Sequence, residues 1–240
     1  MRVTILGSGG GLPSRTRETT SVLVRDGEIA LLLDAGTGAR RLVTYPAHLD
    51  GISHLDIALT HFHLDHVYAL PYLSMLPVGV AVWAPGEWLY GTSSAAILAP
   101  LLRPPLAPEE NDVRVEELHA GEQRIGDFVV RASPQPRHWS PSAGLRVGDR
   151  VALVTDTPYE PTSAALADGV AHLLHEAWSS SPAEHHSTGA DAARVAREAQ
   201  VGQLTLVHLN PRFTDHTDVL EDAAAHFADV RLGEDEQTLG

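Results

Sequence analysis

Short apolar runs separated by turn-forming residues dominate the first part of the chain. Val3–Leu6 has the pattern of a buried strand and leads into a run of glycines. Two further apolar runs, Ser21–Val24 and Ile29–Asp34, lie on either side of Asp26-Gly27, a dipeptide that favours a two-residue hairpin turn. The chain is therefore predicted to open as a β-sheet.

The middle of the chain alternates between strand and helix patterns. Asp56–Leu59 predicts a short buried strand, and Val67–Leu76 follows it with apolar residues at helical spacing until Pro77. Val80–Ala84 predicts another strand. Leu98–Asp112 is rich in proline and is predicted to be an irregular surface loop or lid.

The second half contains more strands and ends in helices. The predicted strands are Val113–Glu117, Asp127–Arg131, Gly144–Val147, Val151–Thr155 and Leu204–Val207, and the predicted helices are Thr188–Gln200 and Asp218–Phe227. This order predicts an α/β fold in which two sheets form a sandwich with helices outside. No repeat or linker divides the chain, so residues 1–240 are expected to form one domain with its ligands at strand ends.

Composition limits the chemistry. The formal net charge of -14 disfavours polyanionic partners unless positive charge is concentrated in one place. The chain has no cysteine, which excludes disulfides, thiolate ligands and a cysteine nucleophile. The N-terminus resembles a strand rather than a signal peptide, and no apolar run is long enough to span a bilayer, so a cytoplasmic protein is expected.

The 14 histidines are numerous for 240 residues, and three of them form a cluster with an aspartate. In His61-Phe62-His63-Leu64-Asp65-His66, the alternating histidines of an extended segment lie on one side, and the Asp-His pair follows at the predicted start of a helix. Imidazole and carboxylate donors suit zinc, with manganese or iron as alternatives. The cluster therefore predicts metal binding rather than unrelated surface or core histidines.

The glycine run has a competing interpretation as a dinucleotide-binding loop. Gly7 and Gly9 fit that fingerprint, but Leu12 occupies the position of the third glycine and Pro13 follows where the helix should run. A glycine turn beneath an active site is the better interpretation.

The cluster resembles the His-x-His-x-Asp-His motif of the metallo-β-lactamase fold superfamily. This resemblance implies an αββα sandwich of two mixed β-sheets with helices on both outer faces, and a site for two divalent metal ions, zinc first among them. It also implies three later ligands, each following a strand: His138, Asp156 and His208. The alternative for His138 is an exposed loop histidine, and that for Asp156 is a capping or turn role. The alternative for His208 is a core histidine whose hydrogen bonds are satisfied.

The superfamily's arrangement distributes these donors between two metals. The first metal is assigned to His61, His63, His138 and Asp156, and the second to Asp65, His66, Asp156 and His208. Asp34, which ends an apolar run, matches an aspartate that supports the ligands through hydrogen bonds.

Three further segments resemble the ribonuclease Z branch. They are Leu174-His175-Glu176-Ala177, His186-Ser187-Thr188 and His208-Leu209-Asn210-Pro211-Arg212-Phe213. The resemblance makes Glu176 and His186 a pair beside the metals, with helix entry and surface polarity as the structural alternative. Trp178 replaces the threonine of the first loop, and His185 precedes His186, which leaves two imidazoles as candidates for the pair.

The chemistry implied is phosphodiester hydrolysis by attack of a metal-bridging hydroxide. Asp65 is expected to accept the proton of the water or to orient the hydroxide, and His186, held by Glu176, to donate a proton to the leaving oxygen.

A small or cyclic nucleotide-type substrate is favoured, because the chain carries no basic arm like that of the tRNA-binding members and its net charge is -14. Arg137, Arg146 and Arg212 are candidates for phosphate contact, with a solvated surface role as the alternative.

Other functions remain open. The same metals would serve a lactone, β-lactam or thioester hydrolase, and a basic face assembled by folding would favour a tRNA 3′-processing endoribonuclease. A regulatory binding module with a structural metal is the alternative from another class, but such a site would be closed. A homodimer is expected only by analogy with ribonuclease Z.

Overall fold

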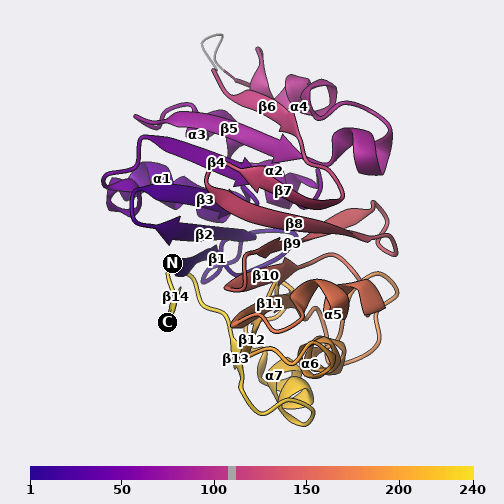
Figure 1. Cartoon of the computed structure of the whole chain (residues 1–240). Coiled ribbons are helices and arrows are strands. Elements are labelled where there is room, and N and C mark those ends of the chain that lie inside the picture. The colour runs from indigo at the N-terminus through magenta and orange to yellow at the C-terminus, as the bar shows by residue number, and fades with distance from the viewer. Residues whose placement is uncertain (108–111) are drawn as a thin grey trace.

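The computed structural model describes residues 1–107 and 112–240 and contains two mixed β-sheets of seven strands each (Figure 1). The first sheet has the order β14 (Thr238–Leu239), β1 (Arg2–Gly7), β2 (Ser21–Asp26), β3 (Ile29–Leu33), β4 (His54–Ala58), β5 (Gly79–Ala84) and β6 (Arg114–Glu117). The second has the order β13 (Val230–Leu232), β12 (Gln203–Val207), β11 (His172–Glu176), β10 (Val151–Val154), β9 (Ser142–Val147), β8 (Phe128–Gln135) and β7 (Gly121–Ile125).

Each sheet combines antiparallel hairpins with parallel strands. In the first sheet β1, β2 and β3 are antiparallel, whereas β3, β4, β5 and β6 run parallel. The second sheet repeats this plan, with β7 to β10 antiparallel and β10 to β13 parallel. The turn between β2 and β3 consists of Gly27 and Glu28, one residue later than predicted, and Gly27 supplies the positive φ of 61°.

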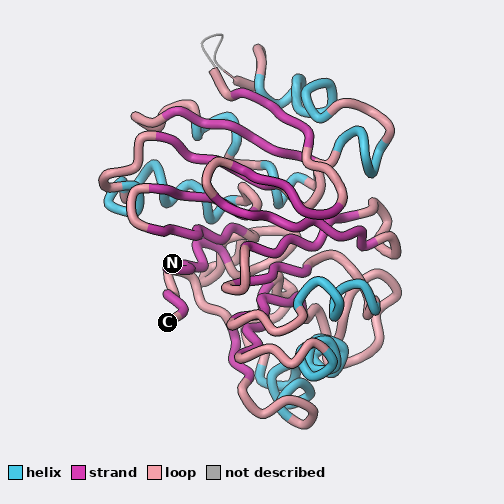
Figure 2. The backbone as a smooth tube through the Cα atoms, viewed as in Figure 1, coloured by secondary structure: helices cyan, strands magenta, loops and turns pink. Residues whose placement is uncertain are grey.

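Three apolar clusters hold four layers together. The central one joins side chains of both sheets, such as Ile5 and Leu31 with Leu145 and Leu153. The outer face of the first sheet is covered by η1 (Thr37–Ala39), α1 (Arg40–Thr44), η2 (Pro46–Leu49), α3 (Leu70–Leu73) and α4 (Ser94–Leu102). The outer face of the second is covered by α5 (Pro161–Ala167), α6 (Gly189–Glu198) and α7 (Thr217–Ala224), and Figure 2 shows the helices lying outside the strands. The predicted αββα sandwich is confirmed.

Two predicted elements differ from the structure. The single helix expected over Val67–Leu76 is replaced by two short turns, α2 (Leu64–Val67) and α3. Pro71 explains the break, because it has no N–H to donate back along the helix and is favoured in the first turn of a new one.

Part of the predicted loop is helical. α4 extends to Leu102 and contains Pro100 near its end. Ser93 caps this helix by accepting a hydrogen bond from the amide of Ala96, and Leu98 and Leu102 are buried against the first sheet. Burial of these leucines outweighs the cost of a proline, and the irregular chain begins only at Arg103. Residues 108–111 of the predicted loop lie outside the described residues.

The sequence pattern missed several elements, including the interior strand β11 and helix α5. η3 (Gly86–Tyr90) completes the described helical segments. Within the described residues, no helix has the length and hydropathy required to cross a bilayer.

Candidate metal and catalytic site

The carboxyl ends of strands from both sheets meet at one edge of the sandwich. Asp34 follows β3, Asp156 lies two residues after β10, and His208 follows β12. All three have left-handed backbone conformations, with φ of 58°, 53° and 49°. Such conformations cost roughly 1–2 kcal/mol per non-glycine residue, so packing holds these side chains in place against local strain.

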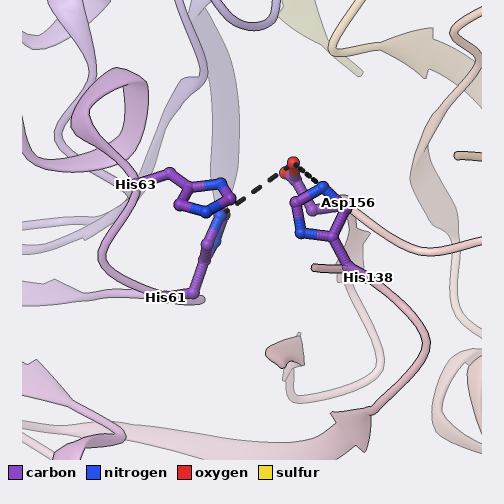
Figure 3. A group of neighbouring side chains, drawn as sticks. All are labelled: His61, His63, His138 and Asp156. Atoms are coloured by element: carbon purple, nitrogen blue, oxygen red, sulfur yellow. Dashed lines mark ion pairs between the residues drawn. The ribbon is translucent and has the colours of Figure 1, made fainter. Parts of the chain in front are cut away.

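The first donor group comprises His61, His63, His138 and Asp156, whose side chains face one another (Figure 3). Their donor atoms all lie within 4.8 Å of one another. Asp156 Oδ1 is 3.9 Å from His61 Nε2 and 3.5 Å from His138 Nε2. His63 Nε2 lies 3.2 Å from Ser140 Oγ, so the loop that carries His138 also contacts the histidine cluster.

The second donor group comprises Asp65, His66 and His208, and their donor atoms also lie within 4.8 Å of one another. Asp65 Oδ2 is 3.3 Å from the Nε2 atoms of both histidines. Asp156 Oδ2 lies 3.1 Å from His66 Nε2 and 3.3 Å from His208 Nε2. One oxygen of Asp156 therefore faces each group, the position that a bridging carboxylate requires.

Electrostatics within the site fit a bound cation. Burial would raise the pKa of Asp156, but His208, His61 and His66 outweigh it and hold that pKa well below its usual value. Burial lowers the pKa of His66, but the carboxylates of Asp65, Asp34 and Asp156 outweigh it and raise the pKa well above 6.5. The carboxylates around His66 thus favour positive charge at this position.

His61 carries the clearest sign of a missing partner. Its ring is buried, burial lowers its pKa, and its Nε2 has no hydrogen-bond partner among the described residues. A buried neutral imidazole nitrogen without a partner costs free energy unless a metal accepts its lone pair. The nitrogen and oxygen donors of both groups are therefore compatible with divalent cations.

Asp34 supports the site from below, as predicted. Its fully buried carboxylate accepts hydrogen bonds from the amide and hydroxyl of Thr60 at 2.7 and 2.9 Å and from His66 Nδ1 at 2.8 Å. Because His66 Nδ1 donates to Asp34, its Nε2 faces the donor group.

Glu176 and His186 form a close pair at the edge of the second group. Glu176 ends β11 and is fully buried, and its Oε2 accepts a hydrogen bond of 2.8 Å from His186 Nδ1. The other oxygen, Oε1, accepts from the amide of Thr157, which fixes the carboxylate. A ring nitrogen of His186 lies within 4.8 Å of donor atoms of Asp156 and His208. His185 instead lies toward the carbonyl of Arg137, so the structure favours His186 as the partner of Glu176.

The glycine run packs beneath the second donor group. A Cβ on Gly10 would lie 2.5 Å from ring atoms of His208, so a larger residue would displace that imidazole. The amide of Gly11 donates to Asp65 Oδ2 at 2.8 Å. Glycine is thus required here by close approach to the histidine.

Two tryptophans beside the site were not assigned a role from the sequence. Trp178 stacks on His186, with ring centroids 4.5 Å apart and an interplanar angle of 13°. Trp139 contacts His138 and His185, with centroids 5.4 and 4.8 Å apart. Two features of the sequence could have drawn attention to them. Trp178 replaces the threonine of the first loop, and Trp139 directly follows the predicted ligand His138.

Two of the three candidate arginines, Arg146 and Arg137, have side-chain partners outside the donor groups. Arg146 donates to the carbonyls of Gly148, Leu166 and Asp168 and pairs with Asp149 at 2.6 Å, which gives it a structural role. Arg137 pairs with Glu160 at 3.3 Å, and its side chain is largely exposed.

Comparison with known proteins gives the family. Residues 30–209 match the model of the β-lactamase superfamily domain. A ribonuclease Z from Prochlorococcus marinus (strain MIT 9303) is 28% identical over 308 aligned residues, which cover 98% of this chain and 96% of the relative. A ribonuclease Z from Methanothermobacter thermautotrophicus is 27% identical over 301 residues, covering 100% of this chain and 96% of the relative. Because these alignments exceed 240 residues, the relatives contain insertions that this chain lacks.

Solved structures share the fold at lower identity. The metallo-β-lactamase fold protein YhfI from Bacillus subtilis has a TM-score of 0.83 at 19% identity, with 100% of this chain and 99% of that chain covered. A diphosphatase of the PhnP family gives 0.79 at 18% identity, with 100% and 97% covered. The short form of human tRNase Z gives 0.71 at 22% identity, with 100% and 99% covered. Together with the match over residues 30–209, these findings show that the chain is a hydrolase of the metallo-β-lactamase superfamily, in its ribonuclease Z-like branch.

Proposed function

We propose that this protein is a metal-dependent phosphodiesterase whose two donor groups hold two divalent cations, zinc first among the candidates. The proposed ligands of the first cation are His61, His63, His138 and Asp156, and those of the second are Asp65, His66, Asp156 and His208. Two cations in such a site polarise the phosphoryl group and make water nucleophilic near neutral pH.

The Glu176–His186 pair is the observation that carries the phosphodiesterase proposal. Glu176 accepts from His186 Nδ1, which leaves Nε2 free to donate a hydrogen bond or a proton at the leaving oxygen. An alkoxide leaving group of a phosphodiester needs such a donor. The same need is weaker for strained β-lactam or lactone rings.

Asp65 is proposed to hold the attacking water. Burial would raise its pKa, but His66 and His208 outweigh this and lower the pKa, so the carboxylate is ionised and accepts hydrogen bonds. The amide of Gly11 donates to Oδ2 and fixes the carboxylate. Asp65 can thus accept a hydrogen bond from water and orient it on the side of the second donor group.

Two substrate classes compete. The names of the curated relatives favour a tRNA 3′-processing endoribonuclease. The net charge of -14 and the shorter chain favour a small or cyclic nucleotide-type substrate, because an acidic surface without added basic segments gains little from counterion release. The cytoplasmic location and the homodimer stay predictions.

An activity panel on metal-replete protein tests the proposal. The substrates are a precursor tRNA with a 3′ trailer, cyclic nucleotides, bis-p-nitrophenyl phosphate, a lactone, a β-lactam and a thioester. We expect about two metals per chain and chelator-sensitive cleavage of at least one phosphodiester. Protein that carries its metals but hydrolyses only the lactone, β-lactam or thioester would overturn the proposal.

A further inference from the structure

Trp139 keeps a large apolar surface in water at the site. It follows His138 on the loop between β8 and β9, and 72% of it is exposed. An indole ring normally gains free energy by burial, so one kept exposed beside catalytic groups indicates a contact with a ligand.

The position of this indole follows from the rings around it. It lies 5.4 Å from His138, 4.8 Å from His185 and 6.2 Å from His186, measured between ring centroids. The indole of Trp178 also contacts His186 and stacks parallel to its ring. Trp139 is therefore an exposed member of a group of aromatic rings around His186, the proposed proton donor.

Other segments of the site also keep apolar side chains in water. Leu64 lies between His63 and Asp65 and is 62% exposed, and Phe213 follows the His208 loop and is 56% exposed. The donor groups suit a phosphoryl group bound through cations, whereas these side chains suit a flat apolar moiety attached to it.

We propose that Trp139 is a specificity-determining residue that stacks on a nucleobase of the substrate, an inference that rests on the proposed phosphodiesterase function. A nucleobase joins an aromatic face to a phosphate through a ribose, which matches an exposed indole beside the donor groups. Stacking is tolerant of base identity and needs no basic surface, so it accommodates the acidic net charge.

Binding tests this inference without relying on turnover. Calorimetric titration of metal-loaded protein compares AMP with ribose 5-phosphate, which lacks the base. Trp139→Ala should weaken AMP binding about 5- to 150-fold, the range that base–aromatic stacking gives, and leave ribose 5-phosphate binding unchanged. Trp139→Phe should retain most of the AMP affinity. Tyr45→Ala, which removes an exposed aromatic side chain from the helical layer, is the matched control and should bind as wild type.

Equal binding of AMP and ribose 5-phosphate by the wild type, or no binding of AMP, would overturn the inference. So would an equal loss for both ligands in Trp139→Ala. A wild type that binds AMP through Trp139 but cleaves no phosphodiester would instead contradict the proposed function alone.

Kinetics identify the source of the base. Methyl esters of AMP and of ribose 5-phosphate, and a precursor tRNA, are compared for wild type and Trp139→Ala. We expect a higher KM with little change in kcat for each base-bearing substrate that the enzyme uses, and no change for the ribose ester. An equal effect on both methyl esters would contradict stacking.

Discussion

Replacing Asp34 by asparagine tests how the second donor group is oriented. Asparagine has nearly the same shape and tolerates the φ of 58° at this position. The amide oxygen of the asparagine can still accept a hydrogen bond from Thr60. Its NH2 group, however, would face His66 Nδ1, which in the wild type donates to Asp34 Oδ2 at 2.8 Å. To avoid two opposed donors, the neutral imidazole must carry its proton on Nε2 instead.

The size of the effect follows from these contacts. A proton on His66 Nε2 blocks the nitrogen that lies 3.1 Å from Asp156 Oδ2 and 3.3 Å from Asp65 Oδ2. Loss of a partner that orients a metal-binding histidine costs about 10- to 100-fold in metal affinity or activity. The weakened buried hydrogen bonds should also lower the free energy of unfolding by about 1–3 kcal/mol.

Metal titration of the stripped protein, followed by calorimetry and elemental analysis, measures the affinity, and denaturant unfolding measures stability. Asp56→Asn is the matched control, because Asp56 is a buried carboxylate within β4 that accepts a hydrogen bond from Trp83 Nε1 at 2.8 Å. We expect Asp56→Asn to bind about two metals as wild type does. Wild-type metal affinity and turnover in Asp34→Asn would refute the reasoning.

Three other predictions follow from the same contacts. His186→Ala should lower kcat by about 100- to 10,000-fold with metals retained, whereas His185→Ala should change kcat only slightly; loss of metal in His186→Ala would show that His186 is a ligand. Gly10→Ala should push the His208 ring aside, cost roughly 1–3 kcal/mol of stability and lower the metal content, and unchanged content would contradict this geometry. The raised pKa of His66 should keep its ring protonated near pH 7 without metal, so zinc affinity should fall as pH falls. Zinc binding should also release protons, which calorimetry in buffers of different ionisation enthalpy measures. Binding without proton release would show that His66 is already neutral.

Elements with regular patterns were predictable from the sequence. The short apolar runs of β1, β3, β4, β10 and β12 were recognised, because strands buried on both faces have continuous apolar sequences. β11 was not, since His172, His175 and Glu176 interrupt its apolar pattern although all five of its residues are buried. The predicted start of the irregular loop at Leu98 was wrong, because tertiary burial of Leu98 and Leu102 outweighs the local effect of proline.

The sequence by itself determined the chemistry of the site. The cluster from His61 to His66 lies between the end of β4 and the first turn of α2, so its four donors are close together along the chain. Nitrogen and oxygen donors without cysteine then restrict the cations that fit.

Only the tertiary structure decided which distant groups complete the site and how they act. The two oxygens of Asp156 face different donor groups because packing holds its backbone in a left-handed conformation. His186 rather than His185 reaches Glu176, and the indoles of Trp178 and Trp139 line the same side. Such contacts depend on how two sheets pack, and spacing along the chain carries no information about the directions in which side chains from different strands point.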